Sequence, residues 1–181
     1  MQLTTRRWAL AAVGTLAMAG FRRKLRAEEL ESIARLVPTD PPKPMPEIGF
    51  ADAGGKPHTL TEFRDHGMVL NLWATWCMPC IAEMAALAAL SRTLAPDDIA
   101  VLPLSSDRGG VDAVKRFYAA HEITALPVLI DQKGAAVAAL GASGIPTTII
   151  VDKQGRERAR LEGAANWATP EAAQKVRSLV G

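Results

Sequence analysis

The 181-residue sequence contains only two cysteines and three histidines, and its formal net charge is just +2. A structural zinc site takes four ligands, and the scattered His58, His66 and His121 offer none at ligand spacing beside the single cysteine pair. The sequence has no basic stripe or aromatic ladder and so gives no indication of nucleic-acid binding. A hydrophobic fraction of 49% is sufficient for a proper core, so we expect one domain plus a tail.

Acidic residues are absent from the first 27 positions. An apolar run over 8–21 lies between Arg6-Arg7 and a basic cluster at 22–26. The run is shorter than the roughly 20 residues of a spanning helix, and it is typical of an export signal. Because the basic cluster resists translocation, an uncleaved anchor or an organellar transit peptide remains an alternative. We predict an export signal or membrane anchor over residues 1–27.

Proline is concentrated in one segment. Residues 38–46 include five prolines, which exclude a helix or a central strand and favour a stiff, extended spacer. Just before them, residues 28–36 could form a short helix that places Leu30, Ile33 and Leu36 on one face. We therefore predict a short helix and a proline-rich spacer over residues 28–46, followed by the folded domain over residues 47–181.

Within the predicted domain, apolar runs of strand length alternate with helical patterns. The order strand, helix, strand predicts a right-handed crossover between two parallel strands. Turn-forming clusters at 52–57 and 152–155 predict one β-hairpin at each end of the domain. We expect strands at 47–51, 58–60, 68–73, 99–105, 126–130, 147–151 and 157–161. We expect helices at 59–63, from the cysteine pair to about 94, at 111–122, at 134–140 and from 170 onward.

Both cysteines, Cys77 and Cys80, stand where the buried strand 68–73 gives way to an apolar helix. A thiolate at a helix N-terminus faces unpaired N–H groups and the positive end of the helix dipole, which lower its pKa. Cys77 is therefore the expected nucleophile of disulfide exchange, and Cys80 the expected resolving thiol. An inert structural disulfide is disfavoured, because so short a loop constrains the unfolded chain little.

The residues around this pair resemble a known family. The run 76–80, Trp-Cys-Met-Pro-Cys, resembles the W-C-x-P-C site of thioredoxins, and residues 70–77 resemble the TlpA/ResA-type thioredoxins of the bacterial cell envelope. The resemblance extends from about residue 46 to the C-terminus. It implies an α/β thioredoxin fold: a central mixed β-sheet flanked by helices, with an N-terminal β-hairpin and a helix–strand insert. It also implies dithiol–disulfide exchange by a redox-active Cys77–Cys80 disulfide, with no organic cofactor and no metal.

The resemblance also implies a surface for protein substrates. Family members place a cis-proline opposite the C-x-x-C motif, and Pro146 occupies that position here. The cis bond leaves the backbone of Ile145 free to pair with an extended segment of a partner. Trp76 is expected to form an exposed lip for partner contact, with Met78 and Pro79 beside it.

A proton carrier for the second cysteine is a separate question. Cytosolic thioredoxins carry a buried Asp six residues before the first cysteine, where this sequence has Asn71, which cannot take up a proton. Glu83 lies three residues after Cys80, on the same helix face, and matches the C-x-x-C-x-x-E pattern of ResA-type proteins. We predict a catalytic role for Glu83, with a solvated helix charge as the alternative. Trp167 resembles a family feature, although core packing explains it equally well.

The resemblance finally implies a pathway. We expect a reductase of cysteine pairs in envelope proteins, preferably in copper-site assembly of cytochrome oxidase, because metal-binding cysteines must be thiols before the ligand arrives. Reduction for cytochrome c maturation is the alternative, as is a Sco-type copper chaperone, although that class uses C-x-x-x-C. We expect a periplasmic monomer, exported or anchored to the inner membrane, that is recharged by a membrane thiol reductant.

Overall fold

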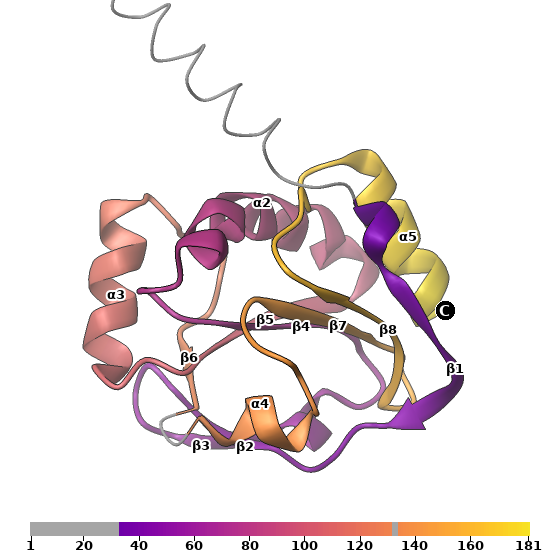
Figure 1. Cartoon of the computed structure of the whole chain (residues 1–181), viewed down its shortest axis with the longest axis horizontal. Coiled ribbons are helices and arrows are strands. Elements are labelled where there is room, and N and C mark those ends of the chain that lie inside the picture. Colours follow the sequence, from indigo (N-terminus) through magenta and orange to yellow (C-terminus); the bar gives the residue numbers. More distant parts are fainter. Residues whose placement is uncertain (1–32, 132–133) are drawn as a thin grey trace, which may run out of the picture. The chain divides into compact units, whose positions relative to one another are not determined.

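The computed structural model describes residues 33–131 and 134–181. The predicted signal or anchor, and most of the predicted helix at 28–36, lie outside the described residues. The described chain forms one eight-stranded mixed sheet with helices on both faces (Figure 1). The strand order is β1-β8-β7-β4-β5-β6-β2-β3, with β4 and β5 parallel and β4 and β7 antiparallel. This confirms the predicted central mixed sheet and the parallel pair around the active-site helix.

The predicted elements of residues 47–181 are all present, including the N-terminal hairpin and the helix–strand insert. In chain order the elements are η1 (Ile33–Arg35), β1 (Val37–Pro44), β2 (Gly49–Asp52), β3 (Pro57–Thr59), η2 (Leu60–Phe63), β4 (Gly67–Trp73), α2 (Met78–Leu94), η3 (Ala95–Asp97), β5 (Ile99–Ser105), α3 (Gly110–Ala120), β6 (Leu129–Ile130), α4 (Ala135–Ala139), β7 (Thr147–Val151), β8 (Arg156–Glu162) and α5 (Pro170–Val180).

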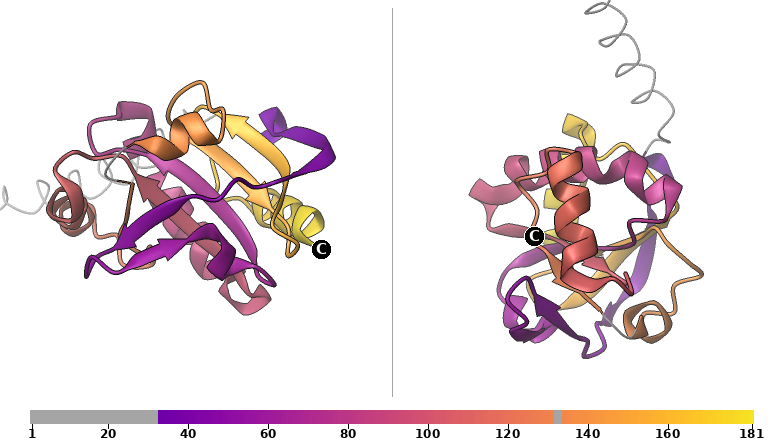
Figure 2. Two further views of the ribbon diagram at one scale, coloured as in Figure 1. Left: turned by 90° about the horizontal axis from the view of Figure 1, so that it is seen from below. Right: turned by 90° about the vertical axis from the view of Figure 1, so that its left-hand side faces the viewer.

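Strand β4 lies at the centre of the sheet, and all 7 of its residues are buried. Val69 and Trp73 pack into a core cluster shared with α2, α3 and α5, whereas Leu70 and Leu72 pack into a second cluster with α4 and the hairpin. Figure 1 shows the same division, with α2, α3 and α5 on one side of the sheet and α4 on the other. The right-hand view of Figure 2 faces α3. The continuous apolar run of β4 is explained by this burial on both faces.

Helix α2 crosses the first of these faces and has Pro79 among its first residues, a position that needs no N–H donor. The stretch Met78–Asp97, which combines α2 and η3, is the one helical segment of the described residues long and apolar enough to cross a membrane by length and composition. Its buried residues pack in the main core cluster, as expected for a central helix. Asp98, in the left-handed conformation with φ 58°, follows and leads into β5.

The residues that form β1 are extended, as predicted, but the prediction that they are a spacer outside the folded domain is wrong. This strand pairs antiparallel with β8 at the edge of the sheet, with a register shift between Pro38 and Lys43. The Asp40–Pro41 peptide bond, within that interval, is cis. Prolines are compatible with an edge strand because one side of such a strand needs no ladder N–H. The folded unit therefore begins before residue 47.

Two smaller differences concern short elements. The predicted strand at 126–130 is reduced to Leu129–Ile130, and the carbonyl of Pro127 accepts a hydrogen bond from the Tyr118 hydroxyl at 3.2 Å. The described end of the predicted helix at 28–36 is the 3-10 turn η1, in which Ile33 is buried. Both segments pack apolar side chains as the sequence pattern indicates, but in shorter elements than expected.

Candidate active site

The two cysteines lie at the junction of β4 and α2. Cys77 is the N-cap residue of α2, and its sulfur accepts a hydrogen bond from the Cys80 backbone N–H at 3.3 Å. The two side chains form a disulfide, with their Cα atoms 5.2 Å apart. Cys80 is 0% exposed and Cys77 is 7% exposed. The more accessible sulfur is thus the one at the helix start, where N–H groups stabilise a thiolate.

The predicted substrate-binding residues surround the accessible sulfur. Trp76 and Met78 are each 67% exposed, and Pro79 is also exposed. The Ile145–Pro146 bond is cis, as the resemblance implies, and the Ile145 carbonyl oxygen lies 3.8 Å from the Cys77 sulfur. Ile145 is half-buried and Pro146 is buried. The structure therefore brings the backbone of Ile145, just before β7, against Cys77, whose sequence neighbours Trp76 and Met78 are exposed.

Glu83, one turn after Cys80 on α2, is completely buried. Its Oε1 accepts a hydrogen bond from Asn71 Nδ2 at 2.9 Å. Its Oε2 accepts two more, from the Ala165 backbone N–H at 2.9 Å and from Trp167 Nε1 at 3.0 Å. The alternative of a solvated helix charge is therefore wrong, because a loop 82 residues away in sequence closes over the carboxyl.

Burial changes the acidity of this carboxyl. Loss of hydration raises the pKa of Glu83 from 4.5 to about 7, although the hydrogen bonds from Ala165, Asn71 and Trp167 act in the opposite direction. Both the carboxylate and the carboxylic acid are then populated near neutral pH. A carboxyl in this condition can accept a proton from a nearby group and release it again, which is the property of a general acid–base.

Asn71 occupies the position at which cytosolic thioredoxins carry a buried aspartate. It lies on β4 opposite Thr148 of β7, and both are completely buried. Its Nδ2 donates to Thr148 Oγ1 at 2.9 Å as well as to Glu83. From the sequence alone, Asn71 is notable only because it stands where an acidic residue is usual. In the structure it is a donor to the acid that lies on the neighbouring helix.

Trp167 is a residue whose place the sequence left open between core packing and the family site. It is 1% exposed and donates its indole N–H to Glu83, so it does both. Trp73 is also buried, as predicted, and its ring stacks on Tyr118 with centroids 5.9 Å apart. The two tryptophans differ in the hydrogen bonding of the indole nitrogen. Trp167 Nε1 donates to Glu83, whereas Trp73 Nε1 has no hydrogen-bond partner among the described residues.

Asp107 is a further residue that sequence reasoning missed. It follows β5 and is buried, and its carboxylate accepts hydrogen bonds from the Thr75 backbone N–H at 2.8 Å and the Thr75 hydroxyl at 2.6 Å. The Ser105 hydroxyl donates to it at 2.7 Å. Since β4 and β5 are parallel, the loops after them meet at one edge of the sheet. That rule could have identified Asp107 as the anchor of the loop before Cys77.

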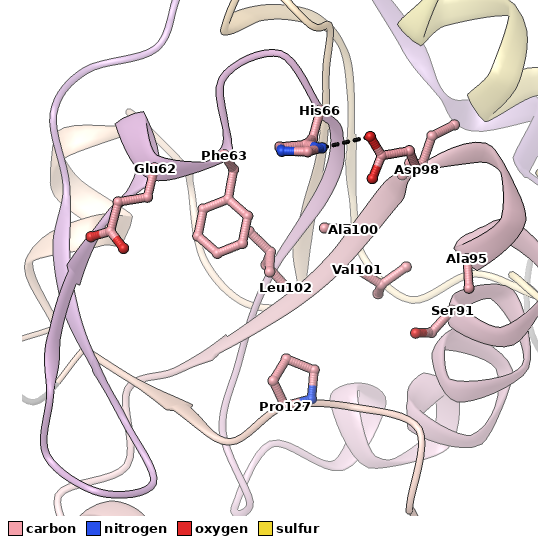
Figure 3. Close-up of a pocket in the computed structure, with 11 residues that line it drawn as sticks. Glu62, Phe63, His66, Ser91, Ala95, Asp98, Ala100, Val101, Leu102 and Pro127 are labelled. Atoms are coloured by element: carbon pink, nitrogen blue, oxygen red, sulfur yellow. Dashed lines mark hydrogen bonds and ion pairs between the residues drawn. The ribbon is translucent and has the colours of Figure 1, made fainter.

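A hollow of about 490 Å³ lies at the opposite end of α2 from the cysteines (Figure 3). Its rim carries the hydrogen bond between His66 Nδ1 and Asp98 Oδ2, 2.7 Å apart. It is lined by Glu62, Phe63, His66, Ser91, Ala95, Asp98, Ile99, Ala100, Val101, Leu102 and Pro127. None of the residues assigned above to the thiol site borders this hollow.

Comparison with known proteins agrees with the fold and the cysteine site. Residues 41–159 match the AhpC/TSA family. The thiol-disulfide oxidoreductase ResA of Geobacillus thermodenitrificans is 29% identical over 154 residues, 85% of this chain and 81% of the relative. The ResA protein of Bacillus thuringiensis subsp. konkukian is 31% identical over 121 residues, 67% of this chain and 69% of the relative.

Solved structures give the same fold. A thiol:disulfide interchange protein of the thioredoxin family from Chlorobium tepidum superposes with a TM-score of 0.64 at 22% identity, covering 79% of this chain and 99% of that one. A DsbF homologue from Corynebacterium diphtheriae gives a TM-score of 0.64 at 24% identity, covering 80% and 92%. At these identities the likeness shows the thioredoxin fold.

The fold and the paired cysteines at a helix N-terminus define a thioredoxin-like thiol–disulfide oxidoreductase. The chain belongs to the AhpC/TSA family, and among its relatives it is similar to the ResA proteins.

Proposed function

We propose that this thiol–disulfide oxidoreductase reduces cysteine pairs in partner proteins. The Cys77 thiolate attacks one sulfur of a substrate disulfide, and the other substrate sulfur leaves as a thiolate. Cys80 then gives its proton to the Glu83 carboxylate and attacks the Cys77 sulfur, which releases the remaining substrate thiolate. Two electrons thus pass to the substrate, whose thiolates take up protons, and the Cys77–Cys80 disulfide remains. Glu83 afterwards returns its proton to solvent.

The observation that carries this proposal is the complete burial of Glu83 one turn from Cys80. A buried resolving thiol has no water to receive its proton, so an acceptor must be provided inside the protein. Asn71 cannot serve, because an amide does not take up a proton in this range of pH. Glu83, with a pKa raised by burial to about 7, can accept the proton and release it.

The exposed side chains around Cys77 support proteins as substrates. Trp76 and Met78 each present most of their apolar surface to solvent beside the accessible sulfur. The Ile145 carbonyl at the same sulfur is a backbone group that an extended substrate segment can meet. A large apolar surface beside a reactive sulfur suits the apolar neighbours of a cysteine in a partner protein.

We further propose that the preferred substrates are cysteine pairs of copper-site proteins in oxidase assembly, because a copper ligand must be a free thiolate before the metal arrives. The location that suits this role is the periplasm, with the domain exported or held at the inner membrane and recharged by a membrane thiol reductant. A monomer is sufficient for the chemistry. A Sco-type chaperone is the less favoured alternative, because that class uses C-x-x-x-C, whereas only two residues separate Cys77 from Cys80.

The test is capture of the substrate. A Cys80→Ser variant keeps the attacking thiol but lacks the resolving one, so it should accumulate a mixed disulfide with its substrate in cells of the source organism. The matched Cys77→Ser variant should capture none. A captured copper-site protein would support the proposal, whereas a captured apocytochrome would assign the enzyme to haem attachment. Equal capture by both variants would overturn the roles given to the two cysteines.

A further inference from the structure

An unpartnered polar atom lies beside Glu83. In the described part of the chain, Asn71 Oδ1 is buried without a hydrogen-bond partner, while Nδ2 of the same amide donates to Glu83 Oε1 and to Thr148 Oγ1. A buried acceptor left unsatisfied is unfavourable, and each such atom in a native protein requires an explanation, of which a catalytic role is one. The amide is therefore held with its donor end toward Glu83 at the expense of its acceptor end.

The two oxygens of Glu83 are not equivalent. Oε2 faces the Ala165 backbone N–H and the Trp167 indole N–H, and both groups can only donate. A proton placed on Oε2 would meet two donors and have no acceptor. Among the described residues, the one hydrogen-bond partner of Oε1 is the Asn71 amide, which has a donor at one end and an acceptor at the other. When Glu83 becomes an acid, the proton must therefore be on Oε1, and Asn71 is the group that can accept it.

We propose that the Asn71 amide turns over when Glu83 takes up a proton, and that Asn71 and Thr148 together position that proton. With Glu83 ionised, Nδ2 donates to Oε1 and to Thr148 Oγ1, as observed. With Glu83 protonated, Oδ1 accepts from Oε1–H and from the Thr148 hydroxyl. In each state the Asn71 amide keeps two hydrogen bonds. Its unpartnered atom is Oδ1 when Glu83 is ionised and Nδ2 when Glu83 is protonated.

The surroundings leave this amide as the responsive element. The groups that donate hydrogen bonds to Glu83 are Asn71 from β4 and Ala165 and Trp167 from the loop before α5, and Cys80 lies three residues earlier on α2. Within the described residues no charged side chain forms a hydrogen bond or an ion pair with it. Asn71 is neutral in both states, so Glu83 can ionise without the repulsion that a second carboxylate at position 71 would impose.

The inference concerns the same carboxyl as the proposed function, but it can be examined in the oxidised protein without any substrate. In the full chain, nuclear Overhauser contacts between the Asn71 side-chain amide protons and the Thr148 methyl group should be present well above the titration midpoint of Glu83. They should be lost well below it. Asn166, the other of the two asparagines in the sequence, accepts from the Ala168 N–H at 3.2 Å and should show no such change.

A Glu83→Gln variant supplies the second arm. The Gln oxygen will take the donors of Ala165 and Trp167, so its NH₂ group must point at Asn71 and requires an acceptor. The Asn71 amide should then be turned over at every pH, and its contact with the Thr148 methyl should be absent throughout. Persistence of the contact in this variant, or through the whole titration of the wild type, would overturn the inference. The disulfide-exchange rate of the same variant reports separately on the proposed function.

Discussion

The two sides of the Cys77–Cys80 pair differ sharply in their environment. On the Cys77 side, Trp76 and Met78 are each 67% exposed. On the Cys80 side, Glu83 and Asn71 are each 0% exposed. The difference supports our proposal that partner proteins contact the exposed side of the motif and that the proton of the resolving step is transferred on the buried side. Changes on the buried side should therefore alter rates and pH dependence, and changes on the exposed side should alter substrate affinity.

Replacing the buried carboxyl should have the largest effect. In Glu83→Gln the resolving step should slow by about 100-fold or more, the usual contribution of a positioned acid–base group. Alkylation of Cys77 in the reduced protein should change little, because that thiol depends on the helix N-terminus. Stopped-flow release of a model mixed disulfide measures the first quantity, with the exposed Glu62→Gln as the matched control. Equal release rates in Glu83→Gln and wild type would show that Glu83 has only a structural role.

The second-largest effect should be a pH dependence of stability that comes from the buried side of the motif. Because the pKa of Glu83 is raised from 4.5 to about 7, the folded oxidised protein keeps a proton that the unfolded chain loses. The contribution of Glu83 to stability should therefore be fully present below about pH 4.5 and be lost as the pH rises through about 7, by roughly 3 kcal/mol in total. The carboxylates of Glu62 and Asp52 raise the pKa of His58, which adds a loss of the same sign. Denaturation of wild type and Glu83→Gln at pH 5 and pH 8 isolates the Glu83 part, and parallel profiles would refute it.

The two buried tryptophans allow a finer comparison. Trp167→Phe removes a donor to Glu83, so it should destabilise the oxidised protein by about 1–3 kcal/mol more at pH 8, where the carboxyl is ionised, than at pH 5. Trp73→Phe removes an indole N–H that has no partner in the described residues, so its cost should be the same at both values of pH. Denaturant titrations of the two variants test this, and an equal pH dependence would contradict the assignment of Trp167.

Truncating the exposed side should give the smallest effect. Trp76→Ala or Met78→Ala should raise KM for a protein substrate several-fold while stability stays within about 0.5 kcal/mol of wild type. Val37→Ala is the matched control, because Val37 is 61% exposed but lies on β1 at the edge of the sheet. Assays with a protein disulfide and with a small-molecule disulfide should differ, since only the protein reaches the lip. A loss that is equal for both substrates would argue against a docking role.

The sequence predicts the framework of the site because the relevant signals are local. The position of Cys77 and Cys80 follows from one strand–helix boundary, and the cis geometry at Pro146 follows from the family motif. The environment of Glu83 is not local. Helical spacing places it on the Cys80 face, but the loop that covers it supplies Ala165 and Trp167 from more than 80 residues away. No periodicity in one helix can report such a closure.

The place of the proline-rich segment was predicted wrongly for a different reason. The prolines at 38–46 correctly exclude a helix or a central strand, but they do not exclude an edge strand, and β1 occupies that place beside β8. Asp107 was missed for a third reason. Its position follows from β4 and β5 ending side by side, a consequence of the predicted parallel pair that the sequence reasoning did not extend to the loops after these strands.

The most direct test of the account is the titration of the Glu83 side-chain carboxyl carbon by NMR in the oxidised protein, where the cysteines do not titrate. A carboxyl buried beneath Trp167 and poised to exchange a proton with Cys80 should show a midpoint of about 7. In the reduced protein, the same resonance should titrate together with the Cys80 thiol as a coupled pair. A single midpoint near 4.5 in both redox states would contradict the central claim that the buried side of the motif handles the proton.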